Sequence, residues 1–193
     1  MTYIEDQKFE NLSYKNETIE NIEYDDCVFE KCIFTEVNMV GCVFNTCVFQ
    51  DCEFKLIKFD HCRMQNASFH SSLLMGINWD ELQSREAKSF PVETFKNCIL
   101  KYNNFIHAYL TKFDFSTSTV MECFFLECTL VKANFRNVVF KHTNFSECNL
   151  TESDFRGAEG YAIDILSSKI KKAKFSFPEV ISLLDALDIS IEK

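Results

Sequence analysis

Large apolar side chains recur at every fifth position along most of the chain. Between Phe9 and Trp79 all fifteen positions of this series are large and apolar, and after a shift of one residue fourteen more follow from Phe90 to Phe155. A second position, two residues before each of these centres, holds mainly Cys, Ala, Ser, Thr or Val. Two inward positions in every five fit neither the 3.6-residue period of an α-helix nor the alternation of a strand. We therefore predict a turn in every pentad.

Like residues also recur every twenty positions, which predicts four pentads per coil and four stacked files of side chains. Each coil then buries its inner face only against its neighbours, as in other solenoids. Stacked phenylalanines add about 0.5–1.5 kcal/mol per pair beyond the burial of their area. We expect an all-β fold of about seven coils, about 34 Å long at roughly 4.8 Å per coil. One such file reads Phe9, Phe29, Phe49 and Phe69, and another reads Phe95, Phe115, Phe135 and Phe155.

Several pentads resemble the A(D/N)LXX unit of the pentapeptide repeat family. They include CVFEK at residues 27–31, ANFRN at residues 133–137 and SDFRG at residues 153–157. The resemblance covers roughly residues 7–158. It implies a right-handed quadrilateral β-helix, with bulky centres on the axis and the small residues in the corners.

The register shift divides the chain into four expected parts. Residues 1–79 form the N-terminal coils, 80–94 a projecting loop or register break, 95–160 the C-terminal coils, and 161–193 a C-terminal cap and dimerisation module. The polar loop is either a tolerated insertion or a partner-binding segment, because loops on rigid scaffolds often carry binding residues. Its candidate contact residues are Asp80, Glu81, Arg85 and Glu86.

The C-terminus changes period. Pro178 and Glu179 are typical of a helix start, and apolar residues at helical spacing follow. Residues 188–192 then alternate like a short strand. This module resembles the cap of Qnr-like pentapeptide repeat proteins, which implies an end-to-end homodimer; the alternative is a cap that covers only the last coil. The candidate interface residues are Val180, Leu183, Leu184, Leu187, Ile189 and Ile191.

The residues that usually carry chemistry give no catalytic pattern. All ten cysteines stand at the small inward position, which suits a small buried apolar side chain. No Cys-x2-Cys pair suggests zinc, and no phosphate-binding loop, nucleotide fingerprint or nucleophile motif occurs. We therefore expect a protein that is not an enzyme, without catalytic residues, metal or cofactor. The four histidines, His61, His70, His107 and His142, stand at outward positions.

The formal net charge of −9 argues against direct binding of nucleic acid and fits a basic partner. Residues 1–79 hold 13 acidic and 6 basic side chains, whereas residues 96–193 hold 12 of each. The acidic field should therefore lie on the N-terminal coils. The alternative is a solvated surface that only keeps the rod soluble. The candidate acidic face consists of Glu20, Glu23, Asp25, Asp26, Glu30, Glu36 and Asp51.

No secretory signal or membrane-spanning run is evident, so we expect a cytoplasmic protein without membrane contact. The resemblance to Qnr-like members and related immunity proteins implies a DNA-mimicking binder. Such a protein would protect DNA gyrase or topoisomerase IV against quinolones or peptide toxins. A rod with acidic walls could enter a basic DNA-binding saddle. The alternative is a generic interaction scaffold with another cytoplasmic partner, because a fold does not determine function.

Overall fold

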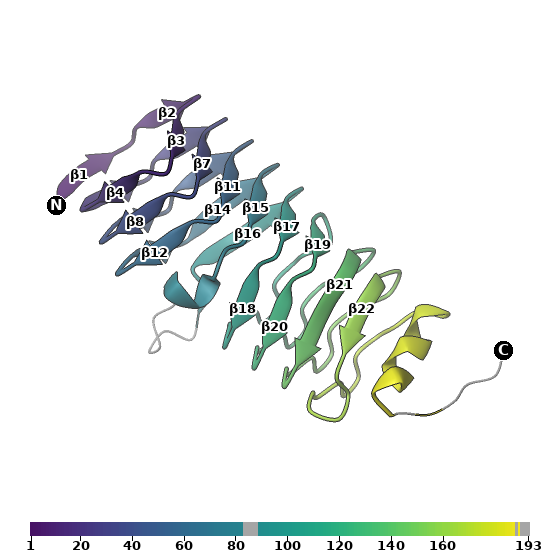
Figure 1. The fold of residues 1–193 in the computed structure, drawn as a ribbon. Helices are drawn as coiled ribbons and strands as arrows, with labels where there is room; N and C mark the ends of the chain where they lie inside the picture. The colour runs from purple at the N-terminus through teal and green to yellow at the C-terminus, as the bar shows by residue number, and fades with distance from the viewer. Residues whose placement is uncertain (83–88, 188, 190–193) are drawn as a thin grey trace.

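The computed structural model of the 193-residue chain describes residues 1–82, 89–187 and 189. Short parallel strands wind into a four-sided solenoid of about eight turns (Figure 1). At roughly 4.8 Å per turn the rod is about 38 Å long. It exceeds the predicted seven coils because the winding continues beyond residue 160.

A residue in the left-handed conformation turns the chain at almost every corner. It is the second residue after each large centre, and the non-glycine examples have φ between 48° and 61°. L-residues reach this region at modest cost, and Asn and Asp reach it most readily. The corner amide then bonds the next turn, as in Asp6 N–H to Asp25 C=O at 3.1 Å. This repeated bend produces the predicted turn in every pentad.

The first and second walls stand on either side of the first corner. They are regular sheets in the N-terminal half and continue as isolated bridges through Lys169 and Lys174 in the C-terminal half. The first wall contains β1 (Thr2–Glu5), β5 (Ile22–Asp25), β9 (Val43–Asn45) and β13 (Arg63–Gln65). The second wall contains β2 (Lys8–Glu10), β6 (Val28–Glu30), β10 (Val48–Gln50), β14 (Ala67–His70) and β16 (Val92–Lys96).

The third and fourth walls complete each turn, and the long strand β21 (Val139–Ser146) bends from one to the other. The third wall also contains β3 (Ser13–Lys15), β7 (Ile33–Thr35), β11 (Glu53–Lys55), β15 (Leu73–Met75), β17 (Ile99–Lys101) and β19 (Thr119–Met121). The fourth wall also contains β4 (Thr18–Glu20), β8 (Asn38–Val40), β12 (Lys58–Asp60), β18 (Asn104–Ile106), β20 (Phe124–Leu126) and β22 (Glu159–Ile163).

Phenylalanine ladders fill the axis, as the twenty-residue period predicts. The ring of Phe125 stacks on Phe105 at 4.5 Å and on Phe145 at 4.6 Å between centroids. Phe135 stacks on Phe155 at 4.7 Å in the file of the second wall, opposite the file of Phe125. These rings are 0 or 1% exposed, so each turn buries its aromatic content against the turns above and below.

The small inward position is a polar link as well as a space filler. The Cys52 thiol accepts the Cys32 amide at 3.4 Å and lies 3.3 Å from the Phe29 carbonyl oxygen. In the next turn the Ser72 hydroxyl accepts the Cys52 amide at 3.0 Å. All ten cysteines are buried and free, and burial raises the pKa of the Cys98 thiol to about 11. Cys, Ser, Thr and Asn occur here because each can bond the corner backbone.

The register shift is absorbed in one turn. Phe69 pairs with Phe95, although 26 residues rather than 20 separate them. A bulge leaves Glu93 exposed between Val92 and Thr94, because its carboxylate cannot be buried without a partner. Sequence reasoning placed the return to regular coils near Phe95; β16 begins at Val92.

The solenoid extends past residue 160, where the sequence placed its end. Lys169 and Lys174 form bridges to Asn149 and Asp154, and Phe175 stacks on Phe155 at 5.4 Å. The last element is the 3₁₀ helix η2 (Glu179–Leu187), which packs against β22. The strand expected at 188–192 lies outside the described residues apart from Ile189.

Candidate binding surfaces

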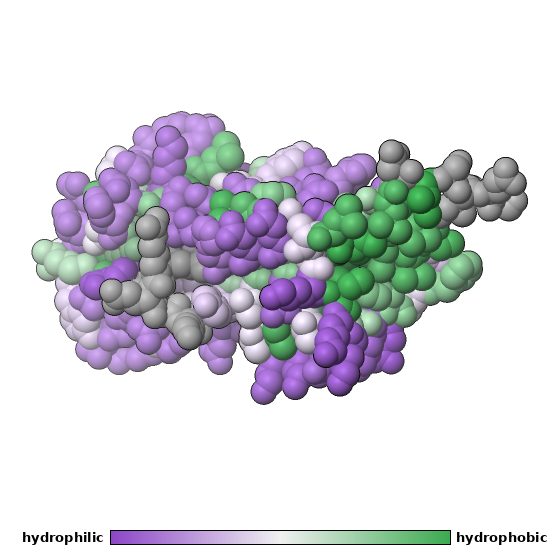
Figure 2. Space-filling view, turned by 90° about the horizontal axis from the view of Figure 1, so that it is seen from below, coloured by the Kyte–Doolittle hydropathy of each residue, from purple (hydrophilic) through white to green (hydrophobic). Residues whose placement is uncertain are grey.

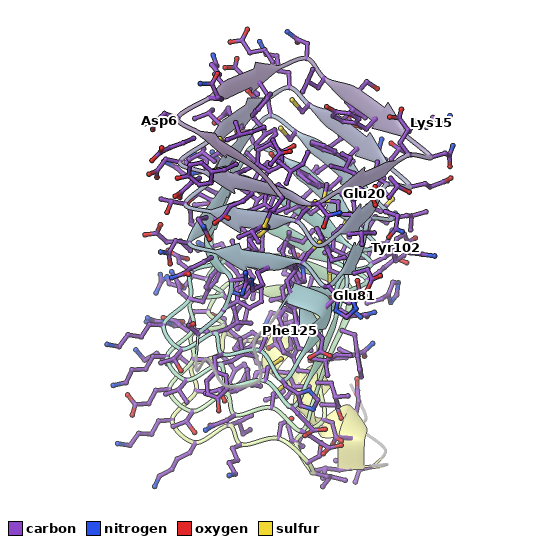
Figure 3. All side chains as sticks on the ribbon, turned by 90° about the vertical axis from the view of Figure 1, so that its left-hand side faces the viewer. Asp6, Lys15, Glu20, Glu81, Tyr102 and Phe125 are labelled. Carbon is purple, nitrogen blue, oxygen red and sulfur yellow. The ribbon has the colours of Figure 1, made fainter. Side chains whose placement is uncertain are left out.

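The seven acidic residues predicted to form one face lie on several sides of the rod. Figure 3 shows side chains that project outward on both sides of the rod, with Asp6 on one side and Lys15 and Glu20 on the other. Only three of the seven share one edge, on the first wall and first corner. The structure places Glu23 and Asp25 on the first wall, Asp26 at the first corner, Glu30 on the second wall, Asp51 at the second corner, Glu36 at the third corner and Glu20 on the fourth wall.

Five carboxylates gather at the N-terminal end of the first corner. The strand pairing sets Glu5 beside Asp25, and Asp6 precedes Asp26 at the same corner. None of the five makes an ion pair among the described residues. We call these five, Glu5, Asp6, Glu23, Asp25 and Asp26, the acidic cluster. It offers an unneutralised surface to a basic partner.

Glu30 is different, because cations already neutralise it. Lys8 and Lys31 lie 2.7 Å and 3.5 Å from its carboxylate oxygens. The hydrogen bond from Lys8 lowers the pKa of Glu30 below its usual value. A paired carboxylate contributes less to the field that a partner meets, so we leave Glu30 out of the acidic cluster.

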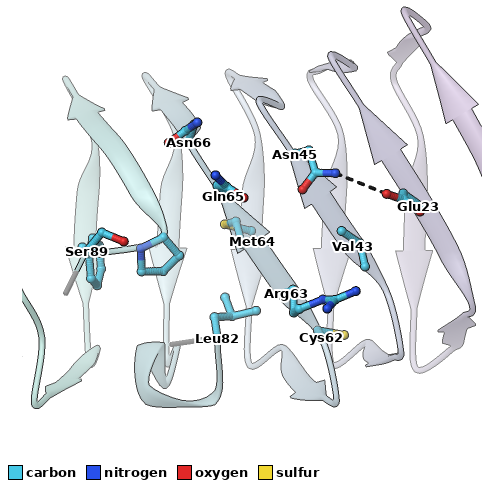
Figure 4. A pocket seen from close by; sticks show the side chains of 12 residues that line it. Glu23, Val43, Asn45, Cys62, Arg63, Met64, Gln65, Asn66, Leu82 and Ser89 are labelled. Carbon is cyan, nitrogen blue, oxygen red and sulfur yellow. Dashed lines mark hydrogen bonds between the residues drawn. The ribbon is translucent and has the colours of Figure 1, made fainter. Parts of the chain in front are cut away.

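An open groove of about 590 Å³ lies on the first wall next to the acidic cluster (Figure 4). Its rim includes Glu23, which accepts a hydrogen bond from Asn45 at 3.3 Å, and Arg63. Leu82 and Phe90 line it on the side of the register shift. Polar and apolar groups therefore meet in this groove, close to the predicted loop.

The first described residues of the predicted loop are anchored to the fourth wall. Asp80 and Glu81 belong to the 3₁₀ helix η1 (Trp79–Leu82). Glu81 accepts the Phe59 amide at 3.0 Å and the Asn78 side chain at 3.2 Å. Asp80 lies 3.7 Å from His107. The other two predicted contact residues, Arg85 and Glu86, lie outside the described residues.

The C-terminal end carries a large exposed apolar surface, seen on the right of Figure 2. Of the predicted interface residues, Leu183 is only 7% exposed and packs into the core, while Val180 and Leu184 are half-buried. Ile191 lies outside the described residues. The exposed residues are Leu166, Phe177, Ile181, Leu187 and Ile189, and we call them the terminal apolar patch.

Two family models match the chain. A pentapeptide repeat region matches residues 22–90, and eight copies of pentapeptide repeats match residues 127–158. Together they cover more than half of the 193 residues. The chain belongs to the pentapeptide repeat family. No curated protein matches it in sequence.

Solved pentapeptide repeat structures share this fold. A trypsin-treated form of QnrB1, a plasmid-mediated fluoroquinolone resistance protein, aligns with a TM-score of 0.61 and 16% identity over 95% of this chain and 99% of that chain. HetL, involved in heterocyst differentiation regulation in the cyanobacterium Nostoc sp. strain PCC 7120, aligns with a TM-score of 0.55 and 10% identity over 88% and 85%. The predicted right-handed quadrilateral β-helix is confirmed.

Sequence reasoning missed two groups of residues on this pentapeptide repeat rod. Glu5 and Asp6 complete the acidic cluster, and the twenty-residue period that sets them beside Asp25 and Asp26 was the available signal. Phe177 and Leu166, which are 80% and 73% exposed, belong to neither a pentad centre nor the helical stripe. No pattern in the sequence marked them. Among the described helices, none has the length and apolar composition needed to cross a membrane.

Proposed function

We propose that this pentapeptide repeat protein is a non-catalytic binder that shields the DNA-binding surface of DNA gyrase or topoisomerase IV. The acidic cluster carries the proposal, because its five carboxylates share one edge of the rod and make no ion pair within the described part of the chain. Duplex DNA presents one negative charge per about 1.7 Å of axis. A rod with clustered acid can therefore occupy a basic groove shaped for DNA.

Solved proteins of this fold have at least two different roles. The resemblance to Qnr-like members implies protection against quinolones or peptide toxins, and a fluoroquinolone resistance protein has the same fold. HetL has the fold as well, with a role in differentiation. A generic scaffold for another cytoplasmic protein is therefore the second candidate, because the fold alone does not select the partner.

A supercoiling assay with purified gyrase tests the first candidate. We expect the protein to restore supercoiling in the presence of a quinolone, with protection falling as salt rises. The triple variant Glu23→Gln, Asp25→Asn and Asp26→Asn should lose most of that protection.

The matched control carries the same charge change elsewhere on the rod. Glu122→Gln, Glu127→Gln and Glu147→Gln remove three carboxylates from the third and fourth corners, and this variant should protect like the native protein. Equal loss in both variants would contradict a role for the cluster. No gyrase binding at low salt would leave the scaffold as the better explanation.

The terminal apolar patch supports a homodimer through the C-terminus. Exposed apolar surface of this kind is typical of protein interfaces. We expect sedimentation at micromolar concentration to give a dimer that Ile181→Asp converts to a monomer. Val139→Asp is the control, because Val139 is also exposed but lies on the third wall. A native protein that sediments as a monomer would end this part of the proposal.

A further inference from the structure

The balanced charge of the C-terminal half hides a separation between its sides. From residue 112 to 174, the first wall, first corner and second wall hold eight cations against the three carboxylates Asp114, Glu152 and Asp154. On the third and fourth walls of the C-terminal half, the described residues include two cations, Lys101 and Lys141. Several glutamates and aspartates surround them. We call the eight cations the basic strip: Lys112, Lys132, Arg136, Arg156, Lys169, Lys171, Lys172 and Lys174.

The centre of the basic strip is a straight column. Lys112, Lys132 and Lys172 all have positive φ at the first corner, where Glu152 holds the turn between the last two. Successive turns are joined by backbone hydrogen bonds of 2.8–2.9 Å from Lys112 to Val131 and from Lys132 to Thr151. At roughly 4.8 Å per turn the column spans about 14 Å. Figure 3 shows nitrogen-tipped side chains projecting on the side of Asp6, over the distant C-terminal turns.

The three carboxylates within the basic strip already have ion-pair or hydrogen-bond partners in the protein. Asp154 lies 2.6 Å from Arg156 and 3.5 Å from Arg136, and the hydrogen bond from Arg156 lowers the pKa of Asp154 to about 2. Glu152 lies 3.6 Å from Lys132, and Asp114 accepts a hydrogen bond from Asn134. Five lysines make no ion pair among the described residues and are free for a ligand: Lys112, Lys169, Lys171, Lys172 and Lys174.

We propose that the basic strip binds the phosphate backbone of duplex DNA. Stable protein interfaces are typically centred on buried apolar or aromatic anchors, but the only exposed large hydrophobics between residues 112 and 174 are Val139 on the third wall and Leu166 at the fourth corner. Binding to phosphates needs no such anchor, because released counterions supply the free energy. The net charge of −9 had argued against nucleic acid, but it averages over opposite ends of the rod.

Screening keeps the two ends independent. Asp26 and Lys112 stand at the same corner four turns apart, about 19 Å at roughly 4.8 Å per turn. This is more than twice the Debye length of about 8 Å at physiological ionic strength. A duplex at the basic strip therefore meets mainly the local positive potential. The inference does not rest on topoisomerase binding.

Fluorescence anisotropy with a labelled duplex of about 20 base pairs and arbitrary sequence tests the proposal. Five phosphate contacts predict a salt slope of about −4.5, which is a roughly 500-fold loss of affinity between 50 and 200 mM salt. The triple variant Lys112→Glu, Lys132→Glu and Lys172→Glu should bind at least about tenfold more weakly, with a slope shallower by about two, because Lys112 and Lys172 are the two counted contacts that it removes. Glutamate suits these corners, because Glu122 and Glu127 have the same positive φ.

A matched variant, Lys15→Glu, Lys58→Glu and Lys141→Glu, has the same net charge but alters only the third and fourth walls. It should keep at least a third of the native affinity, and circular dichroism checks that both variants remain folded. Equal weakening in the two variants, or no duplex binding at 50 mM salt, would overturn the proposal. Competition by poly-L-glutamate or anionic vesicles as effective as that by unlabelled duplex would also overturn it, in favour of an acidic peptide or a lipid surface.

Discussion

Replacing Asn103 by alanine tests whether the small inward position links the backbone or only fills space. Asn103 is fully buried. Its side-chain oxygen accepts the Ile77 amide at 3.2 Å, and its amide nitrogen donates to the carbonyls of Leu74 at 2.8 Å and Lys101 at 3.2 Å. Alanine fits the position sterically, because Ala108 holds the equivalent place one pentad later. The cost of Asn103→Ala therefore comes mainly from lost hydrogen bonds.

The magnitude follows from the groups left behind. A buried amide without a partner costs about 1–3 kcal/mol, and each of the two lost donations costs about 0.5–1.5 kcal/mol. The expected loss in free energy of unfolding is about 3 kcal/mol, or about 6–12 °C in Tm for a chain of this size. Asn103→Ser should lose about half as much, because the Ser118 hydroxyl accepts the Cys98 amide in the same way.

Thermal denaturation gives the global effect, and hydrogen exchange of the Ile77 amide gives the local one. The local measurement matters because solenoids unfold in parts rather than strictly in one step. If the alanine variant lies within about 0.5 kcal/mol of the native protein, or matches the serine variant, the hydrogen-bond reasoning is wrong.

Three further predictions concern the corner, the axis and the acid range. Gly76→Ala should lower the free energy of unfolding in urea by about 1–2 kcal/mol, because φ is +68° and a Cβ would lie 2.6 Å from the Leu56 side chain. Adding Leu56→Ala should remove this steric contact but leave the backbone strain. Phe125→Ala should cost about 3–5 kcal/mol in thermal unfolding, and a loss under 1 kcal/mol would contradict the ladder. The pKa of Asp154 is lowered to about 2 by Arg156, so its stabilisation is complete above its unfolded pKa of about 4 and lost as pH falls through 2. The difference in stability between the native protein and Asp154→Asn should shrink as pH falls from about 4 and vanish only below about pH 2. A difference that stays constant with pH would refute this assignment.

The five-residue period was sufficient to predict the fold, because the same packing requirement repeats in every pentad. A bulky centre such as Phe125 must meet Phe105 and Phe145, and the spacing of twenty states that directly. The hydrogen-bonding role of the cysteines was missed, because composition identifies a small buriable side chain but not which backbone groups it meets.

The binding surfaces were harder to predict than the core. A list of acidic residues along the sequence does not say which share an edge, so Glu20 and Glu36 were grouped with Asp25 although they stand on other sides. Grouping the acidic residues by their position within the twenty-residue period would have separated them. Phe177 is exposed and lies after the last pentad, so the repeat spacing could not predict its exposure.

The left-handed residue at each corner also has a consequence for how such a molecule can change. Its side chain leaves the rod without touching the axis, so Asp6, Lys112 and Tyr102 occupy the same backbone geometry with different chemistry. Four parallel rows of interchangeable positions therefore run along a constant frame. Single substitutions in these rows can change what the surface binds, while the aromatic interior keeps the shape of the rod.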